Sequence, residues 1–137
     1  MRVRAMIALV SAVALAGCGE TIDASAPIAG TYSASVFRVT PSGQSLIDVL
    51  GAGGSLAITI DGSNGVSGTL TIPASIAGTL LTQSMAGYAI TTGTTLQFTQ
   101  SADTFVRNLT WTISGTTLTV TAQVVSGTTY TITLTRQ

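Results

Sequence analysis

Alternation with a period of two residues dominates this chain from about residue 30 onward. In the segment 116–125, TTLTVTAQVV, aliphatic side chains occupy every second position, and mostly threonine or glutamine lies between them. The segment 128–136, TTYTITLTR, repeats the pattern. Successive side chains of a β-strand point to opposite faces, so this alternation predicts strands with one buried face and one exposed, hydroxyl-rich face. The chain is therefore expected to be all-β.

A glycine-centred motif occurs three times in the second half of the chain. Its scheme is small residue, Gly, Thr, Thr, apolar, polar, apolar, Thr, and its copies are TGTTLQFT (92–99), SGTTLTVT (114–121) and SGTTYTIT (126–133). Glycine readily adopts the positive φ of tight hairpin turns, so each copy is predicted to be a turn followed by an outgoing strand. The spacing favours a meander of neighbouring antiparallel strands over a solenoid.

The same pattern predicts eight strands in all, near residues 30–39, 55–61, 65–72, 80–91, 93–99, 104–113, 116–125 and 128–136. A short helix is expected at 45–50 (SLIDVL), followed by a flexible loop at 51–54. Exposed sheet edges usually carry charges, yet only 7% of this chain is charged and it has no lysine. An eight-stranded antiparallel up-and-down β-barrel, which has no edges, is therefore favoured, and a two-layer β-sandwich is the alternative.

Composition narrows the possible functions. The 137 residues include five basic and five acidic ones, one cysteine and no histidine. Such sparse charge argues against a nucleic-acid partner. Without histidine, the Ser-His-Asp and Cys-His arrangements and the usual zinc sites cannot be assembled within the chain. The sequence has no G-x-S-x-G nucleophile motif either. We therefore expect a protein that is not an enzyme and that holds no metal.

One turn-like segment, DGSNG at 61–65, is similar to the start of a calcium-binding loop. The twelfth position of such a loop should be a bidentate glutamate, but here it is Ile72. The segment is interpreted as a turn, and calcium is not predicted.

The N-terminal segment has the features of a secretory signal peptide. Residues 1–15, MRVRAMIALVSAVAL, join a basic start to a short apolar run, and small residues follow. The next four residues, Leu15-Ala16-Gly17-Cys18, resemble the lipobox of bacterial lipoproteins at every position. That resemblance implies cleavage before Cys18, which then carries a covalent diacylglycerol and an N-acyl chain such as palmitate. Residues 1–17 are then the signal peptide, 18–28 the lipidated cysteine and a flexible tether, and 29–137 the barrel domain.

A second resemblance concerns the two ends of the predicted barrel. Gly30-Thr31-Tyr32 opens the first strand, and Arg136 ends the last one on the parity of Tyr130. This is similar to the lipocalin and fatty-acid-binding group, in which a G-x-W motif packs under an arginine from the far end of the chain; here tyrosine replaces the tryptophan. The resemblance implies that Tyr32 and Arg136 close one end of the barrel. The alternative is an ordinary core tyrosine and an exposed arginine.

Candidate ligand-binding residues come from the segment FVRNLTWTI. Regular alternation would point Arg107 inward beside Phe105 and Trp111, where its guanidinium could bind the carboxylate or phosphate of an amphipathic ligand. A bulge or a position at the rim would instead send Arg107 to water or to Asp103. We add Tyr88 to the candidate ligand-binding residues.

Two functions are compatible with these features. The first is a membrane-anchored, lipocalin-like lipoprotein that binds a small apolar or amphipathic molecule inside the barrel. The second is a non-catalytic interaction or structural module of the cell envelope that binds a protein or a glycan. In both cases we expect a monomer attached through Cys18 to a bacterial membrane, and the residue after the cysteine, Gly19, favours the outer membrane by resemblance to other lipoproteins.

Overall fold

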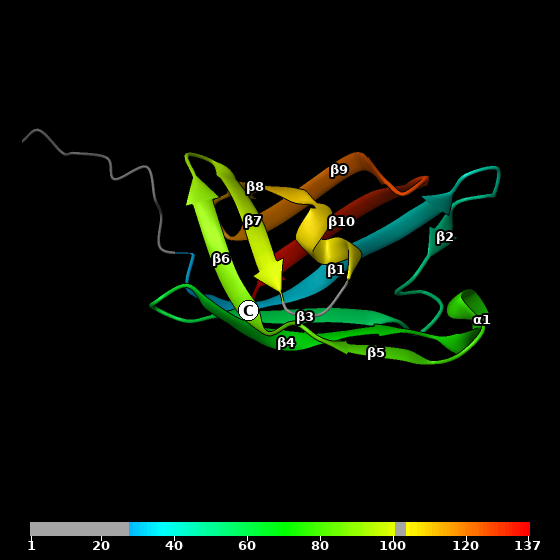
Figure 1. Ribbon diagram of the computed structural model, residues 1–137, viewed down its shortest axis with the longest axis horizontal. Coiled ribbons are helices and arrows are strands. Elements are labelled where there is room, and N and C mark those ends of the chain that lie inside the picture. Colours follow the sequence, from blue (N-terminus) through cyan, green and yellow to red (C-terminus); the bar gives the residue numbers. More distant parts are fainter. Residues whose placement is uncertain (1–27, 101–103) are drawn as a thin grey trace, which may run out of the picture.

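Antiparallel strands make up most of the protein in the computed structural model, which describes residues 28–100 and 104–137 (Figure 1). In chain order, the elements are β1 (Gly30–Pro41), β2 (Ile47–Asp48), β3 (Ser55–Ile60), β4 (Gly65–Ile72), α1 (Ala74–Ala77), β5 (Leu81–Ser84), β6 (Gly87–Thr92), β7 (Thr95–Gln100), the 3-10 helix η1 (Phe105–Asn108), β8 (Thr110–Ser114), β9 (Thr117–Val125) and β10 (Thr128–Arg136).

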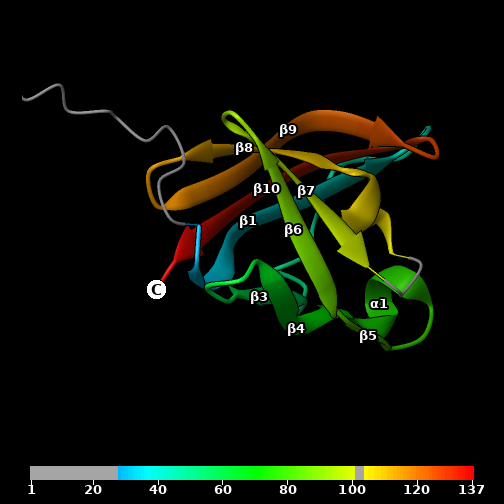
Figure 2. The same cartoon turned by 60° about the vertical axis from the view of Figure 1, so that its left-hand side comes forward.

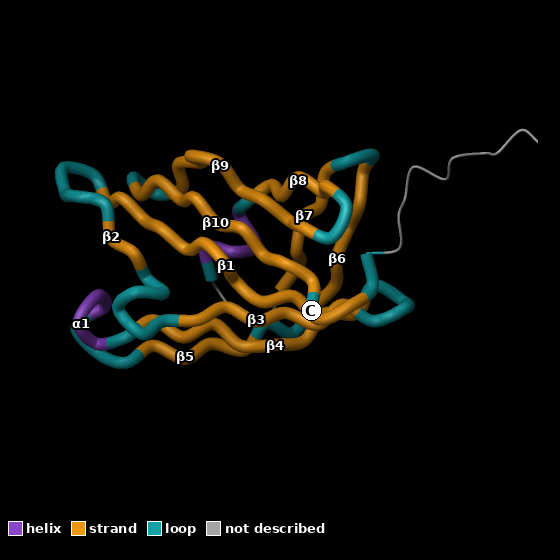
Figure 3. The backbone as a smooth tube through the Cα atoms, turned by 180° about the vertical axis from the view of Figure 1, so that it is seen from behind, coloured by secondary structure: helices purple, strands orange, loops and turns teal. Residues whose placement is uncertain are grey.

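Eight of the strands close into a barrel. The order around the wall is β1, β3, β4, β6, β7, β8, β9 and β10, and β10 pairs back with β1. Neighbours around the wall are antiparallel and follow one another in the chain, so the fold is an up-and-down barrel and not the alternative sandwich. Two short strands are additional: β2 pairs with β1, and β5 pairs with β4. Figure 3 shows β10, β1 and β3 side by side in the closed wall.

The hairpins of the second half begin where the repeated motif predicts them. Gly93, Gly115 and Gly127 have φ values of 60°, 56° and 80°, the left-handed region that glycine adopts without steric cost. They join β6 to β7, β8 to β9 and β9 to β10. The expected meander is therefore confirmed in this part of the barrel.

The short helix lies elsewhere than expected. Residues 45–50 contain the two-residue strand β2, because Val49 is fully buried and its amide donates to the carbonyl of Phe37 on β1. The chain then turns, and the Gly51 amide donates to a carboxylate oxygen of Asp48. The α-helix of the described chain is the single turn Ala74–Ala77, which begins directly after Pro73. Proline suits this place because its ring fixes φ and a helix start needs no amide there.

Two of the eight expected strands are interrupted. The segment 80–91 divides into β5 and β6 because Met85 leaves the ladder, buries its side chain fully and donates its amide to the carbonyl of Gly68. In the segment 104–113, residues 105–108 form η1, and only β8 is a strand. A 3-10 helix has three residues per turn, so the period-two argument does not apply to its side chains.

The core consists of apolar side chains from the described strands, from η1 and from residues directly beside them. Several of them expose none of their surface to water: Phe37, Ile58, Met85, Leu96, Val106, Leu109, Trp111, Leu118, Ile132 and Leu134. Eight-stranded barrels are narrow enough for this, because their interior is just wide enough for side chains to fill.

The barrel has two distinct ends, which Figure 1 and Figure 2 show from different directions. At one end, here called the seal end, β1 begins and β10 ends, and Tyr32 pairs with Arg136. At the other end, here called the helix end, lie α1 and the short strand β2. The segment η1 covers the interior from the helix end, with Val106 buried beneath it.

Candidate functional site

Tyr32 and Arg136 lie in contact at the seal end, as the resemblance implied. The guanidinium carbon of Arg136 is 5.5 Å from the centroid of the Tyr32 ring, which is 2% exposed. One guanidinium nitrogen donates to the carbonyl of Ala29 at 2.6 Å and to the Tyr32 hydroxyl at 3.2 Å. The same hydroxyl donates to the carbonyl of Ile28 at 2.8 Å. The two side chains therefore tie the start of β1 to the end of β10.

The four candidate ligand-binding residues do not gather in one interior pocket. Trp111 is fully buried in the core, where its ring meets Phe98 edge-on with the centroids 5.7 Å apart. Phe105 is half-buried on η1 and stacks on Tyr130 with a centroid distance of 4.4 Å. Arg107 and Tyr88 are exposed.

Of the two positions considered for Arg107, the structure has the one at the surface and not the inward one, because η1 replaces the strand that alternation assumed. Val106 takes the buried position instead, and the Arg107 side chain lies at the surface. Asp103, the alternative partner considered for Arg107, lies outside the described residues. An interior anion-binding arginine is therefore not part of this barrel.

Gly68, a small residue of the barrel wall, does not open the interior either. Gly68 faces inward on β4, and a Cβ placed there would lie 2.1 Å from the carbonyl oxygen of Ala57. This glycine lets two backbones approach closely and does not leave room for a ligand.

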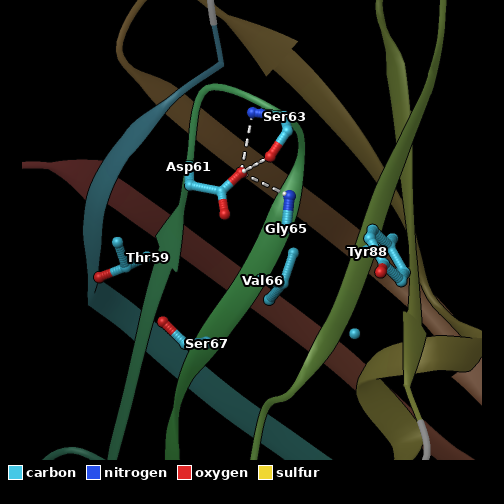
Figure 4. A pocket seen from close by; sticks show the side chains of 8 residues that line it. Thr59, Asp61, Ser63, Gly65, Val66, Ser67 and Tyr88 are labelled. Atoms are coloured by element: carbon cyan, nitrogen blue, oxygen red, sulfur yellow. Dashed lines mark hydrogen bonds between the residues drawn. The ribbon is translucent and has the colours of Figure 1, made fainter.

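A hollow of about 370 Å³ lies on the outer face of the wall, where β3, β4 and β6 meet (Figure 4). We call it the Tyr88 hollow, and its lining consists of Thr59, Asp61, Ser63, Gly65, Val66, Ser67, Gly87 and Tyr88. It exists because β4 pairs with β6 at only two positions, Gly65 with Tyr88 and Val66 with Gly87. Beyond them β4 pairs with β5 instead, and this seam of the wall is lined by glycines.

Asp61 forms the wall of the hollow opposite Tyr88. Its Oδ1 accepts three hydrogen bonds of 2.8 Å, from the Ser63 amide, the Ser63 hydroxyl and the Gly65 amide. These bonds, with the Ser63 hydroxyl the largest contributor, hold the pKa of Asp61 below its ordinary value. The side chain is therefore an ionised carboxylate at neutral pH, and the turn interpretation of residues 61–65 is correct.

The second carboxylate oxygen of Asp61 is oriented over the floor of the hollow. A Cβ placed on Gly65 would lie 2.5 Å from Oδ2, so this oxygen occupies the space above Gly65 that a side chain would otherwise fill. The dashed lines in Figure 4 reach only Oδ1. Oδ2 accepts no hydrogen bond from the described residues that line the hollow.

Tyr88 is the exposed aromatic side chain of this surface. It points outward from β6 and is 65% exposed, whereas its neighbour Ala89 is 4% exposed and faces the core. A second hollow of about 340 Å³, here called the flanking hollow, is lined by Ala86, Gly87, Tyr88, Thr99 and Gln100. Tyr88 therefore lines both hollows.

Sequence reasoning selected Tyr88 as a candidate ligand-binding residue, but it did not select Asp61 as a site residue. The available signal was the Asp-Gly-Ser-Asn-Gly turn, which correctly predicted the local backbone. Asp61 lies near Tyr88 because β4 pairs with β6, although α1 and β5 separate these two strands in the chain. No local sequence pattern encodes this pairing. The expected lipidation site, Cys18, lies outside the described residues.

Comparison with known proteins yields no relative: no family model, curated protein or solved structure matches this chain. In residues 28–100 and 104–137, no helix is both long and apolar enough to span a membrane. The same ranges contain no group of three or more cysteine or acidic side chains that could hold a metal ion.

Proposed function

We propose that this protein is a lipid-anchored, non-catalytic binding protein of the bacterial cell envelope, and that it recognises its ligand on the outer wall of the barrel. A closed β-barrel is a fold compatible with ligand binding. The observation that carries the proposal is the apolar packing of the described core, together with the two surface hollows beside Tyr88, which offer space for a ligand. In this function the barrel is a rigid platform.

The anchor is proposed from the segment Leu15-Ala16-Gly17-Cys18 and its resemblance to a lipobox. Two or more acyl chains hold a protein durably on a bilayer, whereas one chain alone binds only marginally. The non-catalytic part of the proposal rests on composition, because a chain without histidine and with one cysteine lacks the usual nucleophile and base pairs.

The anchor is tested by growing the producing bacterium with radiolabelled palmitate and comparing the full chain with its Cys18→Ala variant. We expect label on the unchanged protein, recovery of that protein in the membrane fraction, and neither for the variant. Label that persists in the variant, or an unchanged chain without label, would overturn the lipoprotein assignment.

The site of binding is tested by extracting the purified Cys18→Ala full chain with organic solvent and analysing the extract by mass spectrometry. A filled core predicts no small apolar molecule in amounts approaching one per chain. A molecule recovered at such a ratio would instead show that the barrel carries a ligand.

Carriage of a small apolar or amphipathic molecule, as in lipocalins, is the second candidate function. The observation that favours it is the stack of Phe105, the first residue of η1, on Tyr130 at the helix end, where both rings are only half-buried. A ligand there would have to displace η1 and take the place of Phe105 against Tyr130. The extraction experiment separates the two functions, and Phe105→Ala should lower the bound amount only if the carrier function is correct.

A further inference from the structure

We propose that the Tyr88 hollow and the flanking hollow together bind a neutral oligosaccharide, with one sugar ring stacked on Tyr88 and two adjacent hydroxyls of that sugar donating to Oδ2 of Asp61. The inference rests on the proposed function, because it names the ligand class of the outer-wall site. It combines an exposed aromatic ring, an available carboxylate oxygen and a lining of hydroxyl groups, which lie together on the seam between β4 and β6.

The exposed ring supplies the apolar part of the recognition. The Tyr88 side chain is 65% exposed and borders both hollows, so its ring face is available to a ligand. The face of an aromatic ring carries partial negative charge. Sugar rings present a face of C–H bonds with partial positive charge, so a flat stack on Tyr88 satisfies both partners and removes apolar surface from water.

The spacing across the hollow suits one sugar ring. Asp61 is bonded to Gly65 across the β3–β4 turn, and Gly65 pairs directly with Tyr88. Neighbouring strands lie about 4.7–4.9 Å apart, so the backbones of Asp61 and Tyr88 are separated by roughly 10 Å. Gly65 lies between them without a side chain, which leaves the floor open for a ring lying against Tyr88.

The carboxylate supplies the polar part. An ionised carboxylate accepts hydrogen bonds and donates none, and hydrogen bonds to charged acceptors are stronger than those between neutral groups. The three bonds to Oδ1 fix the orientation of Asp61 before any ligand arrives. Oδ2 is thereby presented as a positioned acceptor for hydroxyl donors, and Thr59 and Ser67 belong to the same lining.

The charge of the hollows selects against other ligands. Their lining contains one carboxylate and no arginine, and the chain has no lysine, so phosphate, sulfate or acidic sugars would meet only repulsion. A divalent cation prefers six or more oxygen ligands, whereas this site offers one carboxylate whose Oδ1 is already engaged. A purely apolar ligand would strip water from Asp61 without replacing its hydrogen bonds.

The second hollow extends the ligand beyond one sugar. The two hollows share Gly87 and Tyr88; the rest of the first lining comes from β3, β4 and the turn between them, and the rest of the second consists of Ala86, Thr99 and Gln100. A chain of sugars that crosses the ring would place neighbouring units in both hollows, with Thr99 and Gln100 available in the flanking one. We therefore expect a tetrasaccharide to bind more tightly than its monosaccharide.

The test uses the full chain purified from membranes in a detergent that has no sugar headgroup. Calorimetry is performed with cellotetraose, maltotetraose and chitotetraose as neutral probes, with the corresponding monosaccharides, and with a tetramer of galacturonic acid as the acidic probe. At least one neutral tetrasaccharide should bind with a Kd of about 1 mM or lower, and the acidic tetramer should not bind. Failure of all three neutral probes at that level overturns the proposal.

Three variants assign the binding to this site. Tyr88→Ala removes the ring and should weaken binding about tenfold or more, whereas Tyr88→Phe keeps the ring and should change it less than about threefold. Asp61→Asn keeps an acceptor for the turn but can present an amide donor to the sugar, and about a tenfold loss is expected. Equal affinities for the unchanged chain and for Tyr88→Ala would place the saccharide elsewhere and overturn the assignment.

The matched control is Ile90→Ala. Ile90 lies on the same strand as Tyr88, also faces outward and is 53% exposed, but it does not line either hollow. Its removal should leave the affinity unchanged. A chelator should also leave binding unchanged, and a loss of binding on chelation, or binding of the calcium ion alone, would show that the hollow is a cation site instead.

Failure of this inference can be told apart from failure of the proposed function. If no saccharide binds while the solvent extract stays empty and Cys18 is acylated, only the ligand class is wrong. If the extract contains a stoichiometric apolar molecule, the outer-wall function itself is wrong, whatever the saccharides do.

Discussion

The contact between Tyr32 and Arg136 should contribute measurably to the stability of the barrel, and the Tyr32→Phe substitution tests this directly. It removes a buried hydroxyl that donates to the Ile28 carbonyl and accepts from the Arg136 guanidinium. A neutral hydrogen bond contributes about 1 kcal/mol and a charged one about 1.5–3 kcal/mol. The expected loss of unfolding free energy is therefore about 2–4 kcal/mol, or a fall in Tm of roughly 10 °C for a domain of this size.

A double-mutant cycle with Arg136→Met isolates the bond between the two side chains. The ring remains in Tyr32→Phe, so the coupling energy reports the hydroxyl–guanidinium bond, and we expect about 1–2 kcal/mol. Arg136→Met alone should cost more than the coupling, because the Ala29 carbonyl also loses its donor. The double variant should lose less stability than the sum of the single variants.

Urea unfolding followed by tryptophan fluorescence measures these energies. The chain has one tryptophan, Trp111, and it is fully buried in the core, so its emission reports the opening of the barrel itself. The matched control is Tyr88→Phe, the same substitution at a tyrosine that is 65% exposed, which should change stability by less than about 0.5 kcal/mol. Equal stabilities for Tyr32→Phe and this control, or a coupling below about 0.3 kcal/mol, would refute the reasoning.

Three further results are expected. Gly68→Ala should destabilise the barrel by at least about 3 kcal/mol in urea unfolding, because Gly68 has a φ of 142° and its new Cβ would meet the Ala57 carbonyl, whereas Gly62→Ala, with nothing within 4 Å, should be nearly neutral. The folded-state pKa of Asp61 is lowered, so the stability that its carboxylate contributes should be complete above the unfolded pKa and lost as the pH falls through the folded pKa. Urea unfolding at pH values from 7 to 2 should therefore show that the difference in unfolding free energy between the unchanged chain and Asp61→Asn becomes smaller below about pH 4. Cys18→Ser should abolish acylation but leave the unfolding midpoint of the barrel unchanged, as measured on detergent-purified and soluble protein.

Much of the barrel could be predicted from short-range patterns. The three glycine-centred turns required only local backbone preference, and the scarcity of charge correctly favoured a closed wall over open edges. The contact of Tyr32 with Arg136 was implied by resemblance alone, since 104 residues separate them and no periodicity relates them.

The remaining features depend on where the alternation stops. At η1 the buried position passes to Val106, which moved Arg107 to the surface, and at Met85 a side chain leaves the ladder and divides one expected strand into two. The site beside Tyr88 also could not be predicted from the alternation of side chains. It arises where β4 changes partners from β6 to β5, and strand partners are decided by the packing of the whole wall.

The pairing of β1 with β10 also sets the order in which the barrel can be assembled. β1 gains β3 as a neighbour soon after it is synthesised, but its other edge has no partner until a strand about one hundred residues later is available. Contacts this far apart in the chain slow folding, because the loop must close before the pairing stabilises it. Throughout that interval the nascent sheet has an unpaired edge on β1 that can join a second chain. Chaperones that hold unfolded chains should therefore act on this protein chiefly before β10 docks.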